Sequence, residues 1–159
     1  MKGFIRAMAL STAVLAGVSF AALTDQGSAH ENVTGVVKER HDAMKMMKDH
    51  FMPLVQMVKG AAPFDAATVK KNAAIIAAEL EKASKMFPKG SDKGETRAKP
   101  EIWQNEAEFQ ALFKTAIEKA RALENVSAPD QLAPAVMALG GKGCKACHEK
   151  FRKPKEKKM

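Results

Sequence analysis

Apolar side chains recur every three or four residues over most of the chain, in four separate stretches. This spacing is typical of α-helices that bury one face. The first stretch, residues 34–58, predicts a helix in which Pro53 should produce a kink or a split. Its core-facing stripe consists of Val37, Arg40, Met44, Met47, Phe51, Leu54 and Val58.

Three further helices are predicted. Residues 66–86 form the second, after Asp65, a residue type that favours N-caps. Residues 101–125 form the third, and the fourth runs from residue 129 to 151 or 152. A polar loop at residues 87–100 separates the second helix from the third. We therefore expect an all-α protein of one domain, an antiparallel four-helix bundle.

The chain begins with a short basic segment, MKGFIR, followed by an uncharged apolar run, AMALSTAVLAGVSFAAL, and a polar end, TDQGSA. This layout is typical of a secretory signal peptide. We predict that residues 1–29 are removed before His30, with Ser19 and Ala21 marking a second candidate cut, so that residues 30–159 form the mature bundle and its tail. The alternative is a transmembrane anchor, although the run is at the short limit for crossing a bilayer.

The net charge of the chain indicates which partners it can bind. The formal net charge is +8, and Lys2, Arg6 and Asp25 of the predicted signal peptide account for +1 of it, so the mature chain keeps +7. Export excludes nucleic acids as partners, because they are in another compartment. Positive charge near the C-terminus instead favours acidic redox proteins or an anionic membrane surface, the alternative being a solvated tail without a partner. The residues concerned are Lys142, Lys145, Lys150, Arg152, Lys153 and Lys155.

Both cysteines lie in the stretch GGKGCKACHEKFR, residues 140–152. Thiols oxidise readily outside the cytoplasm, so Cys144 and Cys147 in an exported chain require a disulfide, a metal or a covalent adduct. A disulfide between these positions of a helix is geometrically poor. A thioredoxin-type pair usually lies at a helix start after a strand. A zinc site needs four ligands, and the chain has no second tight pair of Cys or His.

Covalent attachment of a c-type haem accounts for each position of the motif. The two thiols can bond to two vinyl groups at one edge of the macrocycle, with Lys145 and Ala146 as free spacers. His148 then offers an imidazole nitrogen to the iron as axial ligand. This attachment takes place outside the bacterial cytoplasm, which agrees with the predicted export. We therefore predict one haem c on the last helix, bound covalently through Cys144 and Cys147.

Three glycines, Gly140, Gly141 and Gly143, precede the motif. Each weakens an α-helix by up to about 1 kcal/mol relative to Ala. We interpret them as a surface without side chains, against which a flat macrocycle can lie. The alternative is a bend or break in the helix before the motif.

The place of the motif separates the families of haem c proteins. In the common small c-type cytochromes it lies near the N-terminus, whereas here it lies on the last of four predicted helices. The segments VVKERHDAMK, FMPLVQMVKGAAPFDAATV, AKPEIWQNEAEF and KACHEKFRK together resemble the class II c-type cytochromes, which are cytochrome c prime and its low-spin relatives. This resemblance covers essentially the whole mature chain. It implies a left-handed antiparallel four-helix bundle that is often paired as a homodimer.

The resemblance also implies a role for Arg40, which matches the family's arginine for a haem propionate. The residues agree, because an unpaired charge on the apolar face of the first helix would be costly. The alternative is that Arg40 lies at the edge of this face and extends to solvent. The family often has Gln after this Arg. Here His41 follows, so the hydrogen bonding of that Gln to a propionate is not carried over, and we expect His41 to be peripheral.

Met44 matches the family's distal residue, which decides between two chemistries. In cytochrome c prime the iron is five-coordinate, a bulky apolar residue shields its distal face, and nitric oxide or carbon monoxide binds. In the low-spin relatives a methionine of this region supplies its sulfur as a sixth ligand, which favours electron transfer. Met occurs here in both groups, and Met46 and Met47 lie close enough to offer another register. The sequence leaves both states open.

The leading functional hypothesis is an exported, periplasmic carrier of single electrons that works with redox partner proteins. The second is a five-coordinate protein that binds a diatomic gas as a trap or sensor. A hypothesis of another class is a helical bundle that handles zinc or copper through its thiols. The sequence contains no recognisable set of catalytic acid, base and nucleophile, so we do not predict an enzyme.

Overall fold

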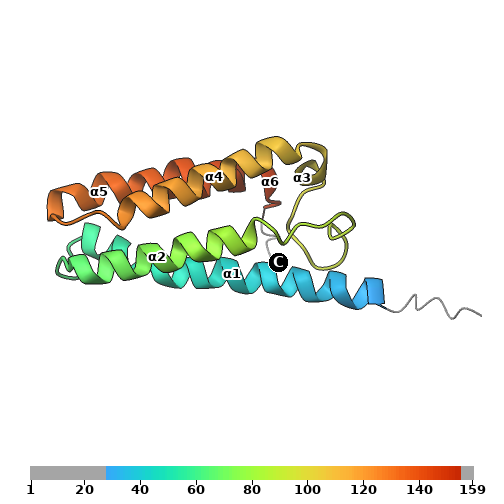
Figure 1. Ribbon diagram of the computed structural model, residues 1–159, viewed down its shortest axis with the longest axis horizontal. Helices are drawn as coiled ribbons and strands as arrows, with labels where there is room; N and C mark the ends of the chain where they lie inside the picture. Colours follow the sequence, from blue (N-terminus) through green and yellow to red (C-terminus); the bar gives the residue numbers. More distant parts are fainter. Residues whose placement is uncertain (1–27, 155–159) are drawn as a thin grey trace, which may run out of the picture.

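The computed structural model describes residues 28–154, with side chains from residue 35 onward. Figure 1 shows two layers, α1 with α2 and α4 with α5. α1 packs on α2, α2 on α4, and α4 on the last helix, whose α5 part returns to α1. This confirms the predicted four-helix bundle. The helices are α1 Ser28–Val58, α2 Ala66–Ala83, α3 Glu101–Gln104, α4 Glu106–Leu123, α5 Pro129–Ala138, the π-helix η1 Leu139–Lys145 and α6 Ala146–Phe151.

The first two helices follow the sequence pattern closely. Pro53 lies within α1 without splitting it. The predicted split is therefore not seen, although the proline removes one backbone hydrogen bond from the helix. Asp65 caps α2 as predicted, accepting hydrogen bonds from the backbone nitrogens of Ala67 and Thr68 at 3.2 and 3.1 Å. α2 ends at Ala83, three residues earlier than expected.

The third predicted helix is divided in the structure. Asn105 has φ −125° and ψ 47°, outside the helical region, and it separates α3 from α4. Its backbone nitrogen and its side-chain Nδ2 both donate to the carbonyl of Glu101, at 2.9 and 3.2 Å. The asparagine therefore satisfies a carbonyl that the interrupted helix would leave without a partner.

The fourth predicted helix has the expected extent, but one part of it is not an α-helix. Residues Leu139–Lys145 form η1, a π-helix that contains all three glycines of the motif region, and the backbone nitrogen of Ala146 bonds to the carbonyl of Gly141. A π-helix is wider than an α-helix and is frequent at functional sites. Glycine eases this conformation because it carries no Cβ. The π-helix contains Cys144, and Cys147 follows it in the first turn of α6.

Gly143 is required by helix packing. A Cβ atom at this position would lie 3.2 Å from Cα of Ala116 on α4 and 3.1 Å from Cδ1 of Leu139. At Gly140 it would lie 3.4 Å from the ring of Phe51, whereas at Gly141 nothing lies within 4 Å. The interpretation of the glycines as one surface for a macrocycle is therefore incomplete, because Gly143 also lets η1 approach the backbone of α4.

Gly143→Val is expected to lower the free energy of unfolding by about 1–3 kcal/mol, the usual cost of overpacking a close contact. The matched control is Gly141→Val, which adds the same atoms at an exposed position with open space. Urea unfolding followed by circular dichroism measures both. Equal losses in the two variants would contradict the packing role of Gly143.

An aromatic cluster joins the loop after α2 to both later helices. The ring of Phe109 on α4 lies edge-on to Phe87, Phe113 and Phe151, with centroids 4.7, 5.1 and 5.2 Å apart. Trp103 of α3 lies beside Phe87, and its Nε1 donates to the carbonyls of Phe87 and Pro88 at 3.1 and 2.9 Å. These contacts hold the loop against the end of the bundle where the last helix finishes.

The predicted signal peptide, residues 1–29, lies outside the described residues except for its last two, which begin α1. The cleavage site before His30 therefore stays a prediction. Among the helices described, none combines the length and the apolar character needed to cross a bilayer.

Candidate functional site

A cavity of about 340 Å³ lies among the four helices of the bundle. Its walls are mostly apolar, with Lys48 and Arg152, both exposed, as the charged groups of its lining. Each helix of the bundle contributes, so the cavity is a product of the tertiary fold. The other lining residues are Met44, Met47, Phe51, Ile76, Leu80, Leu112, Phe113, Ala116, Leu139, Gly140, Gly143, Cys144, Cys147 and His148.

Cys144, Cys147 and His148 all line this cavity from the last helix. Positions three and four residues apart share one face of a helix, which is why the motif delivers two sulfurs and an imidazole to one place. Burial raises the pKa of the Cys144 thiol, and burial together with Cys144 raises that of Cys147 to about 11. The two cysteines form no disulfide with each other, and the raised pKa keeps an unattached thiol protonated at neutral pH.

His148 has the protonation state that a metal ligand needs. Burial lowers its pKa from 6.5 to about 4, and the positive charges of Arg152 and Arg97 act in the same direction. The imidazole is therefore uncharged at pH 7 and keeps the nitrogen lone pair that a metal ligand needs. Protonation begins to remove that lone pair only as the pH falls towards 4.

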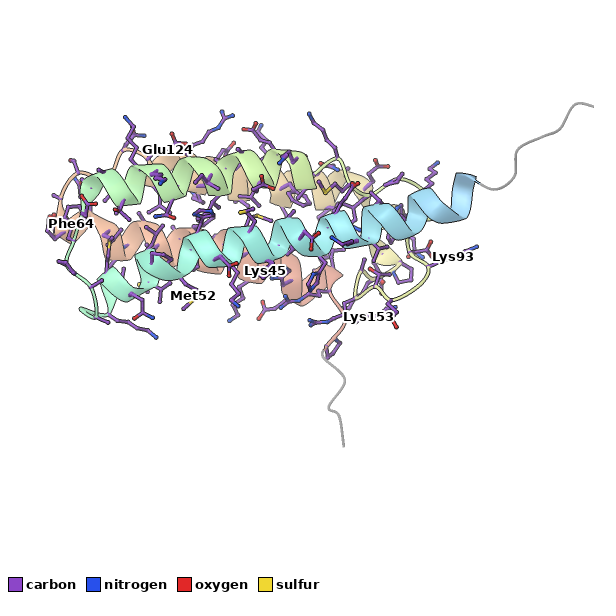
Figure 2. All side chains as sticks on the ribbon, turned by 90° about the horizontal axis from the view of Figure 1, so that it is seen from below. Lys45, Met52, Phe64, Lys93, Glu124 and Lys153 are labelled. Atoms are coloured by element: carbon purple, nitrogen blue, oxygen red, sulfur yellow. The ribbon has the colours of Figure 1, made fainter. Side chains whose placement is uncertain are left out.

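The methionines of α1 separate into two groups. Met44 and Met47 line the cavity, Met44 partly buried and Met47 only 9% exposed, whereas Met46 is 45% exposed and does not line it. Figure 2 shows the outer face of α1, with Lys45 and Met52 labelled on it. Two of the three sequence candidates for a distal residue therefore share the cavity with His148.

Arg40 does not extend to solvent, because its side chain is 5% exposed. Its Nη2 donates to the backbone carbonyl of Ser91 at 2.6 Å, and its guanidinium lies 4.7 Å from the centre of the Phe87 ring. Nη1 is buried and has no hydrogen-bond partner, and burial lowers the pKa of the group. A buried cation with a free donor requires an acidic partner. The contacts with Ser91 and Phe87 had no signal in the sequence, since they depend on how the loop folds back.

The residues present fit a covalent haem. Two thiols and a neutral imidazole line one mostly apolar cavity. Arg40 is not among the lining residues, but its buried Nη1 is a free donor for a carboxylate such as a propionate. The hypothesis of a zinc or copper site has less support, since the described residues contain no group of three or more His, Cys, Asp or Glu side chains that could hold a metal ion.

Comparison with known families decides between these interpretations. The family model described as Cytochrome C' matches residues 35–152, which include the four helices and the cavity. The chain belongs to the cytochrome c' family. Its cofactor is therefore one covalently attached haem c, and the resemblance to class II c-type cytochromes is confirmed.

Cytochrome c' proteins and a cytochrome c-556 both match over most of their length. A cytochrome c' of Alcaligenes xylosoxydans is 36% identical over 122 residues, 75% of this chain and 94% of the relative. A cytochrome c-556 of Agrobacterium tumefaciens is 30% identical over 119 residues, 74% and 97% of the two chains. A variant of cytochrome c prime from Alcaligenes xylosoxidans, solved as a nitric oxide complex, superposes with a TM-score of 0.70 at 31% identity, covering 77% of this chain and 97% of that one.

Two features around the cytochrome c' cavity could not be read from the sequence. Lys48 had no motif that marked it, yet it reaches the cavity because it follows Met44 by one helical turn. The positive residues near the C-terminus, here called the basic rim, are also partly neutralised, because Lys145 lies 3.5 Å from Glu149 and Lys150 forms an ion pair with Glu108 of α4. The second pairing joins residues far apart in the chain.

Proposed function

We propose that the protein is a periplasmic carrier of single electrons. The bound haem supplies an iron that alternates between the ferric and ferrous states. Cys144 and Cys147 attach the cofactor, His148 provides the proximal nitrogen, and Met44 provides a sulfur on the distal side. The observation that carries this proposal is that an imidazole and the Met44 side chain line one apolar cavity.

The lining of the cavity supports electron transfer over chemistry on a bound substrate. No carboxylate lies among its described lining residues, so the protein offers no acidic side chain there to donate or accept a proton. Nitrogen and sulfur ligands keep the same coordination in both oxidation states, which keeps reorganisation of the site small. Arg40 is proposed to neutralise a propionate through its free Nη1.

Met44→Ala is expected to convert the iron from low-spin to high-spin. The variant should lose the long-wavelength ferric band that methionine coordination produces, because the distal sulfur is removed. Met47→Ala is the matched control, since Met47 lines the same cavity one turn later. Optical and electron paramagnetic resonance spectra of the ferric holoprotein measure both variants. A band lost only in Met47→Ala would move the ligand assignment to Met47.

The same spectra test a second candidate function, the binding of nitric oxide or carbon monoxide at a five-coordinate iron. The similar protein solved as a nitric oxide complex favours this candidate. In this case the mostly apolar side chains around the distal face, Met44 included, would shield the iron and admit only small ligands. High-spin wild-type ferric protein that gains no sixth protein ligand on reduction would favour gas binding and oppose the proposed electron carrier.

Export supports the periplasmic part of the proposal. Residues 1–29 have the layout of a signal peptide, and covalent haem attachment of this kind takes place outside the cytoplasm. Cell fractionation of a bacterium that expresses the full chain, together with mass spectrometry of the holoprotein, tests it. A mature protein that begins near residue 30 is the expected result, and a full-length chain in the membrane fraction would oppose it.

A further inference from the structure

The C-terminal end of the last helix pairs with the loop that precedes α3. Ala98 and Arg152 form an isolated antiparallel bridge. The backbone nitrogen of Lys153 donates to the carbonyl of Arg97 at 2.7 Å, and Nε and Nη2 of Arg97 donate back to the carbonyl of Lys153 at 3.0 and 2.9 Å. This pairing brings together Arg97, Arg152 and Lys153, which we name the arginine–lysine cluster.

The arginine–lysine cluster has no acidic partner among the described residues. Arg97, Arg152 and Lys153 form none of the ion pairs found, whereas the nearby acids Glu108 and Glu149 are paired with Lys150 and Lys145. Like charges on paired segments destabilise the fold. Burial lowers the pKa of Arg152, the charge of Arg97 lowers it further, and the group that acts in the opposite direction is the thiol of Cys147 and not a carboxylate.

The cluster also lies beside the cofactor site. Arg152 lines the cavity that contains Cys147 and His148, and the charges of both Arg152 and Arg97 act on His148. Lys153 is exposed where the chain leaves the bundle (Figure 2), and Arg97 is half-buried. An anionic group bound here would therefore lie close to Cys147 and His148, the residues that would hold the haem.

We infer that the arginine–lysine cluster is the docking surface for an acidic redox protein, whose carboxylates pair with Arg97, Arg152 and Lys153. This inference rests on the proposed electron carrier and names the partner chemistry of the same site. Lys145 and Lys150, which the sequence places in the same basic rim, contribute little because Glu149 and Glu108 already neutralise them.

The test measures the oxidation of the ferrous holoprotein by ferricyanide, a trianion, in a stopped-flow instrument. Arg97→Gln combined with Lys153→Gln should slow the reaction about tenfold at low ionic strength, and the difference should vanish at high salt. With the trication tris(phenanthroline)cobalt(III) as oxidant, the same variant should react faster than wild type. The control, Lys70→Gln with Lys71→Gln, removes two exposed charges from the first turns of α2 and should change neither rate.

A charge-conserving variant separates electrostatics from structure. Arg97→Lys combined with Lys153→Arg alters the hydrogen bonds to the backbone but keeps both charges, so it should retain the wild-type rates. Titration of ¹⁵N-labelled holoprotein with hexaglutamate should shift the amide signals of residues 97–99 and 151–153. Shifts spread evenly over lysines elsewhere would overturn the inference, as would slow reaction of the charge-conserving variant.

A haem propionate is the alternative anion for this cluster. In that case the Gln variant would change haem loading or reduction potential and leave the ferricyanide rate unchanged, which would also overturn the inference. Failure of the proposed function has a different signature, namely a high-spin iron without a sixth protein ligand in the wild-type spectra, which is measured independently of these rates. If the wild type and all variants react at the same rate, the docking surface is excluded but the proposed electron carrier is not.

Discussion

Replacing both Cys144 and Cys147 with alanine is expected to abolish covalent haem completely. These are the only cysteines in the chain, and both line the cavity. Without sulfur no thioether bond to the macrocycle can form, so haem extracts with acidic acetone and none stays on the denatured protein. Pyridine haemochrome absorbance and haem staining of a denaturing gel, after expression with haem-attachment machinery, measure the loss.

Single variants and a spacer variant sharpen this prediction. Cys144→Ala and Cys147→Ala should each keep at most one thioether bond, and the haemochrome band should shift towards that of a haem with one free vinyl group. Lys145→Ala lies between the cysteines with an exposed side chain, so it should keep the attached haem. Covalent haem in the double variant would refute the attachment site, and loss of haem in Lys145→Ala would show that the spacer is not free.

His148→Gly is expected to remove the proximal ligand from all the haem that the protein carries. The wild-type imidazole is neutral at pH 7, because burial lowers its pKa to about 4, and its position fits iron ligation. Any haem attached through the cysteines would then lack the protein nitrogen, and added imidazole should restore the wild-type spectrum by filling the same space. Resonance Raman spectroscopy of the ferrous protein, through the iron–histidine stretch, measures the ligation.

His41→Ala is the matched control for the proximal ligand. The side chain of His41 is 81% exposed and does not line the cavity, so its removal should leave the spectrum unchanged. A normal spectrum in His148→Gly, or a spectrum altered equally by both replacements, would oppose the assignment of His148.

The sequence predicted the bundle well because each helix carries a continuous apolar stripe, and because Asp65 is a strong local capping signal. The sequence did not predict local changes in helix geometry that depend on tertiary contacts. Asn105 interrupts the third helix because its φ and ψ lie outside the helical region, whereas the sequence around it continues the helical pattern. The π-helix at residues 139–145 has no periodicity of its own, and the close packing of Gly143 on Ala116 is visible only in the tertiary structure.

The residues of the site show the same distinction between what a local motif predicts and what depends on the tertiary structure. Cys144, Cys147 and His148 could be predicted as a group because their chemistry lies in five consecutive residues. The neighbours of Arg40 could not be found, since Ser91 is 51 residues away in the chain and reaches the guanidinium only through the fold of the loop. The neutralisation of Lys150 by Glu108 was hidden for the same reason. Pairings between distant segments require the tertiary structure.

The fluorescence of Trp103 can report on haem binding without an added label. It is the only tryptophan, and the chain has no tyrosine, so emission from the indole is not mixed with that of other residues. The indole is hydrogen-bonded to the loop at Phe87 and Pro88, and the ring of Phe87 lies 6.1 Å from that of Phe113, a residue of the cavity wall. An absorbing macrocycle in that cavity would quench the indole by energy transfer. The intensity of the emission would therefore fall as haem is attached. Its wavelength would change when the loop is released into water.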